Sequence, residues 1–305
     1  MLLLGIITGL LAAFCQSLCY MATRYFVQRR PAGANRTLLV LANIEMGLVS
    51  LALLPFFWPH IVVDWHVFLE PTLLALGTYI VGQAALLVAL RYAEPSKVSP
   101  LLGLKLIVLA GLSSTLYPGS LTGLQWSAVV VCVAGALALY HAGGRWHPLA
   151  LSAVVVACLF YSFSDWNIKR MINALPEGHS LAWRSMFAML VCYSLSGIVA
   201  VPFLWLWGSR RYREWRGVMS YVASWYTAMW LLFACFAFVG PVYGNILQST
   251  RGLISILLAA AAGHVWKGAH HIEVPTGRGE LFRRLAAGTL MFSAVALYAL
   301  KNWPW

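Results

Sequence analysis

Residues 95–117 read PSKVSPLLGLKLIVLAGLSSTLY, an apolar run that opens with a proline and holds Lys105 near its middle. A run of about 20 apolar residues is long enough for an α-helix to cross roughly 30 Å of hydrocarbon. Residues 241–264, PVYGNILQSTRGLISILLAAAAGH, repeat this design around Arg251. Each cation follows its opening proline by ten residues, which places it ~15 Å deep at ~1.5 Å per residue. The two stretches therefore predict membrane helices with a cation at the midplane.

The composition of the whole chain predicts a membrane protein as well. Apolar residues make up 61% of the 305 residues and charged residues 10%, whereas a soluble domain carries about 25% charged residues. Apolar runs predict ten spanning helices, at 3–24, 37–58, 71–91, 95–117, 122–141, 148–168, 181–207, 219–239, 241–264 and 284–301. Within lipid each span must be helical, because open backbone groups find no water there. The predicted fold class is an all-α polytopic membrane protein.

The chain divides into two similar halves, residues 1–145 and 146–305. At an offset of about 146, the matching pairs are Ser17 and Ser162, Tyr20 and Asp165, Arg36 and Arg184, Pro55 and Pro202, Tyr79 and Trp225, Pro95 and Pro241, and Lys105 and Arg251. Five spans per half is an odd number, so the second half is predicted to be inverted relative to the first. Inverted repeats are typical of transporters that bind their solute near the midplane. A duplicated scaffold without transport is the alternative.

The net charge of +12 belongs mostly to the short loops between the apolar runs. One set of loops holds Arg29, Arg30, Arg36, Arg91, Lys97, Arg145, Arg210, Arg211, Arg213, Arg216, Lys267, Arg278, Arg283 and Arg284. The opposite set holds only Lys169, Arg170, Arg184 and Lys301. The positive-inside rule makes the first set cytoplasmic and puts both termini outside. This topological role leaves no reason to expect a nucleic acid as partner.

At this point the chain resembles the drug/metabolite transporter superfamily, in particular its EamA-like members with ten helices. The resembling stretches are ALRYAEPSKVSPLLGLKLIVLAGLSS (89–114), WSAVVVCVAGALAL (126–139) and LAWRSMFAMLV (181–191). The resemblance implies a basket of helices around a central cavity, which is lined by the first, third, fourth, sixth, eighth and ninth spans, with the fifth and tenth at the periphery. It implies transport of a metabolite, amino acid, sugar or drug, by exchange or with protons. It also implies cytoplasmic termini, against the charge count, so the orientation stays open.

Lys105 and Arg251 are the sharpest candidates for solute binding. A cation at the midplane costs ~2.5–3.5 kcal/mol on insertion scales, so both call for compensation. Either a buried carboxylate pairs with them structurally, or they face a hydrated cavity and bind an anionic group. Arginine holds a carboxylate or phosphate bidentately, and lysine adds a point charge. The favoured solute is therefore anionic or zwitterionic.

Further polar and aromatic residues lie in the spans that the resemblance assigns to the cavity. The candidates for substrate binding are Gln16, Tyr20, Tyr79, Gln83, Ser162, Trp225, Asn245 and Gln248. Gln16 and Tyr20 are four residues apart, and Gln248 lies three before Arg251, so each pair shares a helix face. Aromatic rings could pack on the body of a solute, although tyrosine and tryptophan also gather at membrane interfaces.

Two carboxylates and three prolines complete the set of candidates. Glu45, ~12 Å into its helix, could carry a coupling proton or pair with Lys105 or Arg251. Asp165 is the second candidate for proton or ion coupling, with an interfacial position beside Lys169 or Arg170 as the alternative. The candidate hinges are Pro95, Pro100 and Pro241, which could equally mark static kinks.

These features favour a secondary transporter that moves a small organic solute across a lipid bilayer. The expected location is a bacterial inner membrane. A flippase for a lipid-linked sugar or phosphate group is the alternative, and a membrane enzyme that modifies lipids is the third candidate. No catalytic or metal cluster and no nucleotide-binding motif is found, and His270–His271 and the six cysteines are interpreted as loop and packing residues. No cofactor is expected, and the oligomeric state is left open between monomer and homodimer.

Overall fold

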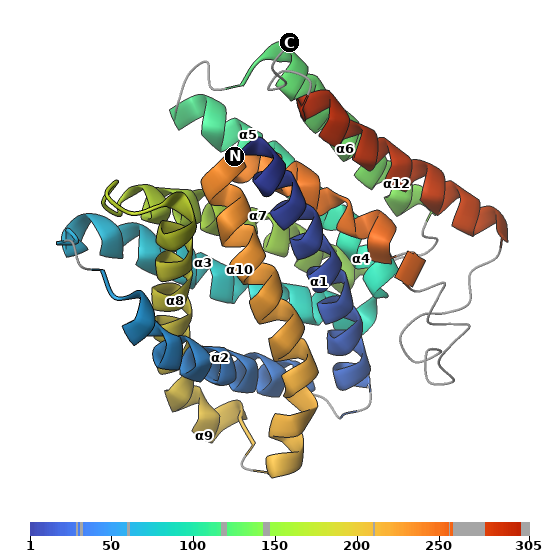
Figure 1. Ribbon diagram of the computed structural model, residues 1–305. Coiled ribbons are helices and arrows are strands. Elements are labelled where there is room, and N and C mark those ends of the chain that lie inside the picture. The colour runs from blue at the N-terminus through green and yellow to red at the C-terminus, as the bar shows by residue number, and fades with distance from the viewer. Residues whose placement is uncertain are drawn as a thin grey trace.

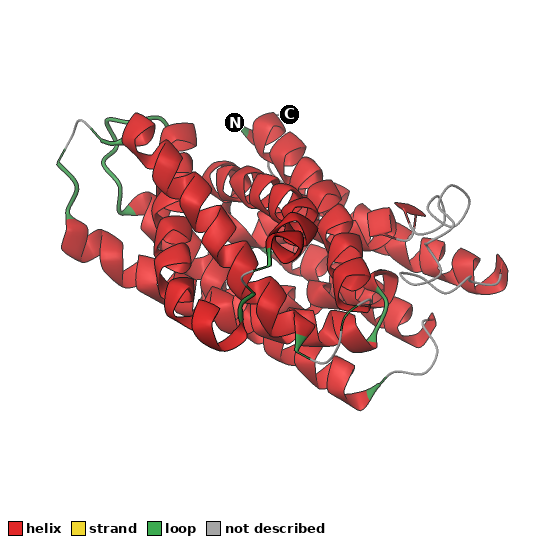
Figure 2. Ribbon diagram, turned by 90° about the horizontal axis from the view of Figure 1, so that it is seen from below, coloured by secondary structure: helices red, strands yellow, loops and turns green. Residues whose placement is uncertain are grey.

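The computed structural model describes residues 1–28, 30, 33–59, 62–116, 121–142, 147–209, 211–255, 257–258 and 278–299. Every regular element in these ranges is a helix (Figure 2), so the predicted all-α class is confirmed. The α-helices are α1 (Leu2–Gln28), α2 (Ala34–Leu53), α3 (Trp65–Tyr92), α4 (Pro95–Leu101), α5 (Lys105–Leu116), α6 (Gly123–Ala142), α7 (Pro148–Asn173), α8 (Leu181–Ala200), α9 (Leu204–Trp207), α10 (Tyr212–Ser249) and α12 (Arg278–Ala299). Three 3₁₀ segments join them: η1 (Leu54–Phe57), η2 (Leu102–Leu104) and η3 (Val201–Phe203).

Seven helical stretches in the described ranges are long and apolar enough to cross a membrane. Two shorter apolar helices, at Gly123–Ala138 and Gly288–Tyr298, fall within α6 and α12. The longest stretch, Tyr212–Ser255, covers two of the spans predicted from the sequence. The predicted spans therefore coincide with helices wherever the structure describes them, although the helices are not always continuous.

The long helix α10 is interrupted at Gly240. This residue has φ 79° and ψ 166°, a backbone conformation that essentially only glycine adopts. Pro241 then starts a new helical segment, because a residue without an N–H is tolerated in the first turn. The break lies where the sequence predicts one span to end and the next to begin.

Prolines also shape the other irregular helices. Pro55 lies in η1 and Pro202 in η3, directly after α2 and α8. The predicted span 95–117 is built from three pieces, because η2 separates α4 from α5. Pro100 lies in the last turn of α4, and a missing backbone donor favours a shift from α-helical to 3₁₀ geometry at this point.

The helices pack in pairs, around one large hydrophobic cluster and a second one that includes α6 and α12. The main partners are α1 with α10, α3 with α7, α2 with α8, and α6 with α12. Figure 1 shows α6 and α12 side by side at one flank of the molecule, away from the bundle formed by the other pairs. The large core cluster contains aromatic side chains such as Tyr20, Tyr79, Trp225 and Phe236. This core positions the site described below.

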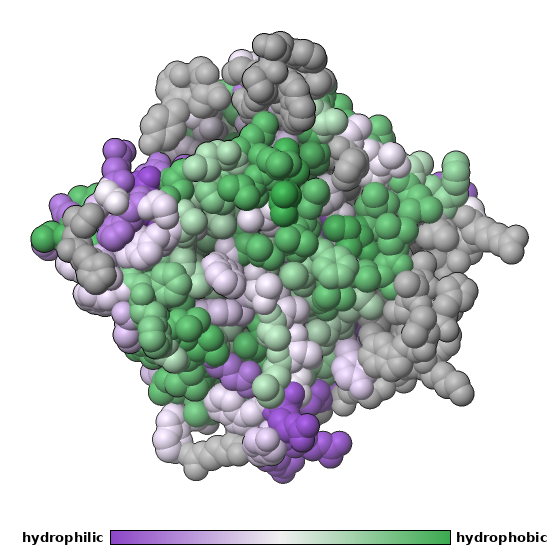
Figure 3. All heavy atoms as spheres, in the orientation of Figure 1, coloured by the Kyte–Doolittle hydropathy of each residue, from purple (hydrophilic) through white to green (hydrophobic). Residues whose placement is uncertain are grey.

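The surface carries many large apolar side chains. Phe56, Val62, Trp205 and Leu206 are each at least 70% exposed. In the view of Figure 3 apolar atoms cover most of the described face, while hydrophilic atoms gather at the lower edge and at the upper left. Contiguous exposed apolar surface of this kind marks contact with a membrane.

Some sequence predictions lie outside the described residues. These are the pair His270–His271, the boundary between residues 145 and 146, and the ends of the spans 241–264 and 284–301. All six cysteines lie in described helices and are free thiols.

Candidate functional site

Lys105 and Asp165 form a buried ion pair inside the bundle. Lys105 is the first residue of α5, and Asp165 lies on α7. The lysine Nζ lies 2.8 Å from Oδ2 of Asp165, and the two side chains are 5% and 6% exposed. Two charges removed from water need such a close geometry and further hydrogen bonds to be tolerated. A carboxylate therefore compensates the buried lysine, as one of the two sequence-based alternatives requires.

Asn245 supplies the further hydrogen bond to Asp165. Its side-chain amide donates to Oδ2 of Asp165 over 2.9 Å and to the Pro241 carbonyl over 2.8 Å. Asn245 Oδ1 itself has no hydrogen-bond partner within the described ranges. The carboxylate thus connects α5 and α7 with the segment of α10 that follows the break at Gly240.

Arg251 lies in the helical residues 251–255 and is 2% exposed. One guanidinium nitrogen donates to Oε1 of Gln16 over 2.7 Å and to Oε1 of Gln248 over 3.1 Å. The guanidinium carbon lies 5.9 Å from the centre of the Tyr20 ring. The shared helix faces predicted from the spacing are therefore present, and they meet at Arg251.

No described carboxylate pairs with Arg251. Arg251 Nε and Gln248 Nε2 are buried donors without a hydrogen-bond partner among the residues that the structure describes. Buried donors left in this state cost free energy, and an acceptor brought in from outside the chain would satisfy them. Of the two cations, Arg251 is therefore the one without a carboxylate partner in the described part of the chain.

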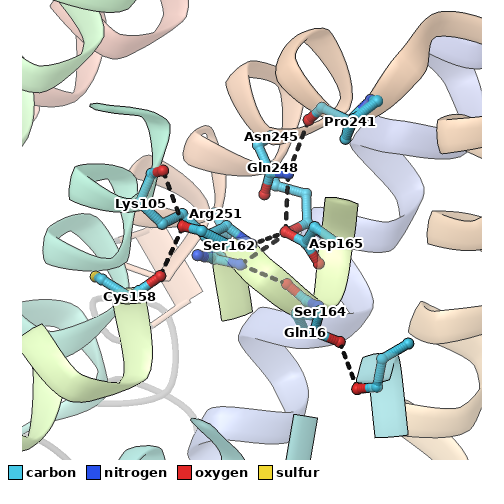
Figure 4. A network of polar contacts seen from close by, with 11 residues as sticks. Gln16, Lys105, Cys158, Ser162, Ser164, Asp165, Pro241, Asn245, Gln248 and Arg251 are labelled. Carbon is cyan, nitrogen blue, oxygen red and sulfur yellow. Dashed lines mark hydrogen bonds and ion pairs between the residues drawn. The ribbon is translucent and has the colours of Figure 1, made fainter. Parts of the chain in front are cut away.

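Two serine hydroxyls donate hydrogen bonds to the backbone carbonyls of the two cations. Ser17 Oγ donates to the Arg251 carbonyl over 3.2 Å, and Ser162 Oγ donates to the Lys105 carbonyl over 3.0 Å. Figure 4 shows Ser162 between Lys105 and Cys158, with Asp165 and Asn245 beyond them toward Pro241. Each serine comes from the half opposite to the cation that it holds.

Aromatic rings form a second wall of the site. The ring centre of Tyr79 lies 5.7 Å from that of Tyr193 and 6.3 Å from that of Trp225, and Tyr20 lies 6.5 Å from Trp225. Their π-faces could receive an apolar group or a cation of a solute. The site therefore combines a charged part with an aromatic part.

These groups line one central cavity. Its lining residues are Gln16, Tyr20, Tyr79, Lys105, Tyr161, Ser164, Asp165, Ile168, Cys192, Tyr193, Ser196, Trp225, Met229, Leu232, Phe233, Gln248 and Arg251. The room for water is only about 30 Å³, enough for a water molecule or two. The cavity is closed in the sense that an organic molecule would fit only if these side chains moved apart.

Of the predicted site residues, Gln83, Ser162 and Asn245 lie behind this lining. The Gln83 side chain accepts a hydrogen bond from the Tyr161 hydroxyl and donates one to the Tyr221 hydroxyl. Tyr221 in turn stacks on Trp225, with ring centres 6.0 Å apart. Gln83 therefore holds the aromatic wall, while the other two hold the ion pair and the backbone at Lys105.

Glu45 lies on α2, away from the lining residues. It is half-buried, and its Oε1 has no hydrogen-bond partner among the described residues. The sequence suggests that Glu45 could pair with Lys105 or with Arg251. In the structure Lys105 pairs with Asp165 instead, and no described carboxylate pairs with Arg251.

The structure does not support the alternative in which Asp165 takes an interfacial position beside Lys169 or Arg170. Lys169 donates to the Ala237 carbonyl over 3.1 Å, and Arg170 pairs with Glu70 over 2.9 Å. Both neighbours therefore have other partners, and Asp165 is a buried residue of the site.

Sequence reasoning missed Tyr161, Ser164, Tyr193 and Ser196. Tyr161 could have been predicted, because it matches Gln16 in the alignment of the halves. Its ring centre lies 5.8 Å from Lys105 Nζ. Tyr193 and Ser196 lie on α8, which the family resemblance does not assign to the cavity. The fifth and tenth predicted spans, seen as α6 and α12, contribute no described lining residue.

The comparisons with known proteins agree with this architecture. Residues 3–140 match the family model described as EamA-like transporter family. A solved structure titled "Crystal structure of protein" is similar with a TM-score of 0.64 and 17% identity, over 97% of this chain and 98% of the other. At this identity the likeness concerns the fold alone. No curated protein sequence matches the chain.

Proposed function

We propose that the chain is a secondary transporter for a small anionic or zwitterionic solute and belongs to the EamA-like transporter family, within the drug/metabolite transporter superfamily, because residues 3–140 match the model of this family. The observation that carries the solute class is the pair of buried cations, Lys105 and Arg251, in the lining of one cavity. Membrane transport itself is the activity of the family.

The proposed topology has ten spans. The break at Gly240 divides the stretch Tyr212–Ser255 into two of them, and α6 and α12 add two more to the remaining helical stretches. Each half, residues 1–145 and 146–305, then holds five spans, and an odd number inverts the second half.

Contacts at the two cations support an inverted repeat. Lys105 meets Asp165, Tyr161 and Ser162, all from α7. Arg251 meets Tyr20, Gln16 and Ser17, all from α1. These two triplets occupy matching positions in the sequence halves, and each contacts the cation of the opposite half. A two-fold relation between the halves produces this exchange.

The packing of whole helices follows the same rule. Helix α1 packs on α10, and the corresponding α7 packs on α3, while α2 with α8 and α6 with α12 are pairs of corresponding helices. In transporters with inverted repeats, the halves exchange their conformations and open the site alternately to each side. We propose this mechanism here, with the closed cavity as the intermediate between the two open forms.

Arg251 is the proposed anchor of the anionic group. Arg251 Nε and Gln248 Nε2, which have no acceptor among the described residues, offer donors to a carboxylate or phosphate, and arginine can bind such groups with two parallel hydrogen bonds. The aromatic wall of Tyr79, Tyr193 and Trp225 would receive the rest of the solute.

Asp165 and Glu45 remain the candidates for proton or ion coupling. Asp165 has the stronger support, because it lies in the lining of the cavity, whereas Glu45 does not. Pro95, Pro100 and Pro241 remain the proposed hinges: Pro95 starts α4, Pro100 shortly precedes η2, and Pro241 follows the break at Gly240.

A flippase for a lipid-linked sugar or phosphate group is the second candidate, since a phosphate would fit the same donors. The closed, enclosed cavity favours a small solute over a lipid-linked one. A lipid-modifying enzyme is the third, and the described residues hold no group of three His, Cys, Asp or Glu side chains suited to a metal ion.

The test is solute uptake into proteoliposomes that contain Arg251→Ala or Lys105→Ala protein. We expect each variant to lose at least ~90% of the uptake of an anionic solute. The loss of about 1.4 kcal/mol of solute-binding free energy already weakens binding tenfold. Arg283→Ala is the matched control, since Arg283 is an exposed arginine of α12. Wild-type kinetics in folded Arg251→Ala protein would remove the proposed site.

A further inference from the structure

The charges in the cavity lining do not cancel. Among the lining residues that the structure describes, Lys105 and Arg251 bring two positive charges and Asp165 brings one negative charge, so this ionised lining has a net charge of +1. The excess is at Arg251, because Asp165 is already bound to Lys105 and to Asn245. Tyr20 occupies the position that matches Asp165 in the first half, so no carboxylate faces Arg251 from there.

A buried net charge is costly where water is excluded. The room for water in the closed cavity is about 30 Å³, and charges interact strongly in such surroundings because little solvent screens them. A solute that brings one negative charge makes the closed site neutral. A zwitterion would leave +1 in place, and a dianion would leave −1.

We propose that Asp165 sets the charge of the transported solute, so that the site selects monoanions over zwitterions and dianions. This inference rests on the proposed function and narrows its solute class. Asp165 acts here as a built-in anion for Lys105, and the solute supplies the matching anion for Arg251.

The test uses three probes that share a benzyl body, which suits the aromatic wall of Tyr79, Tyr193 and Trp225. 3-Phenylpropionate has one negative charge, phenylalanine is a zwitterion, and benzylmalonate has two negative charges. Each is added to the purified full-length protein at a pH at which the carboxylates are ionised, and the shift of the melting temperature reports binding to the folded state.

The variants change the charge of the lining stepwise. Wild type has +1, Asp165→Asn has +2, Lys105→Gln has 0, and the double variant returns to +1. We expect 3-phenylpropionate to bind best to wild type and to the double variant, benzylmalonate to Asp165→Asn, and phenylalanine to Lys105→Gln. The expected preference for the favoured probe is at least ~10-fold in affinity.

Gln248→Glu is an independent variant that leaves the ion pair intact. It places a carboxylate where the Gln248 amide now lies 3.1 Å from Arg251 and lowers the net charge to 0. We expect this variant to bind phenylalanine more tightly than 3-phenylpropionate. It keeps the inference testable if a single variant of the ion pair fails to fold.

The outcomes separate this inference from the proposed function. If 3-phenylpropionate binding depends on Arg251 but the ranking of the probes stays the same in Asp165→Asn, Gln248→Glu and the double variant, the anion site stands and charge selection by Asp165 is wrong. If Arg251→Ala binds 3-phenylpropionate as wild type does, the anion site is wrong as well. If no probe binds to any folded variant, selection of benzyl monoanions is wrong.

Discussion

Lys105 and Arg251 occupy matching places in the two halves and meet different partners. Lys105 is paired with a carboxylate, while Arg251 has amide oxygens and an aromatic ring. The sequence predicts both cations, because a charge in the middle of an apolar run is conspicuous. It leaves open which of them the protein itself neutralises, since that depends on the side chains that face each cation across the cavity.

Gln83 shows a different role of a predicted site residue. It joins the hydroxyls of Tyr161 and Tyr221 and so fixes the aromatic wall from behind. We expect Gln83→Leu to lower stability by about 1–3 kcal/mol for each hydroxyl left buried without a partner. Thermal unfolding of the protein in detergent measures this loss.

The control for Gln83→Leu removes the stranded hydroxyls as well. In the triple variant with Tyr161→Phe and Tyr221→Phe, apolar groups of similar shape replace all partners of the network, which is close to neutral. The melting temperature should therefore recover. A Gln83→Leu protein that melts like wild type would contradict this role.

At the scale of the helices, two glycines let α2 and α8 approach closely. A Cβ added to Gly47 would lie 2.5 Å from the Cα of Gly197 on the facing helix. We expect Gly47→Ala to push these helices apart and to lower stability by about 1–3 kcal/mol, as overpacking does. Gly77→Ala on α3 is the matched control, because nothing lies within 4 Å of the added atom; its melting temperature should not fall.

The break in α10 depends on Gly240 in a similarly specific way. An added Cβ meets no atom within 4 Å, so the cost of Gly240→Ala comes from its backbone conformation alone, about 1–3 kcal/mol. If the break is a hinge, Gly240→Ala should slow uptake in proteoliposomes by several-fold beyond its effect on stability.

Gly33 provides the control for that measurement. It also has a positive φ, 101°, with open space around it, but it lies at the start of α2. Gly33→Ala should lower the melting temperature without a comparable loss of uptake rate. Equal uptake losses in both variants would show that the break in α10 is a static kink.

At the scale of the whole molecule, several cations of the basic loops lie close together. Arg30, Arg36 and Arg211 line one cleft, which joins the start of α2 to the start of α10. The Gln28 side chain donates to the Arg91 carbonyl, so the end of α3 lies at the same place. Arg30, Arg36, Arg91 and Arg211, four of the cations that the sequence assigns to one side of the membrane, are therefore neighbours in space.

Their side follows from the positive-inside rule, which makes this end cytoplasmic. In intact cells we expect a membrane-impermeant maleimide to label Arg170→Cys and to leave Arg36→Cys unlabelled until the cells are permeabilised. The native cysteines give little background, because five of the six are buried. The reverse labelling pattern would give the chain the orientation with cytoplasmic termini that its family resemblance implies.

The membrane class, the helical character of the apolar runs and the two cations could be predicted from the sequence, because apolar runs, prolines and isolated charges are local features. The comparison of the halves also matched Lys105 with Arg251 and Asp165 with Tyr20 as equivalent positions. The contacts of these residues are visible only in the fold: Asp165 neutralises Lys105, Arg251 keeps donors without a partner among the described residues, and Gln83 lies behind the aromatic wall. Such contacts join residues far apart in the chain, and a buried charge takes its role from whatever side chain the fold places beside it.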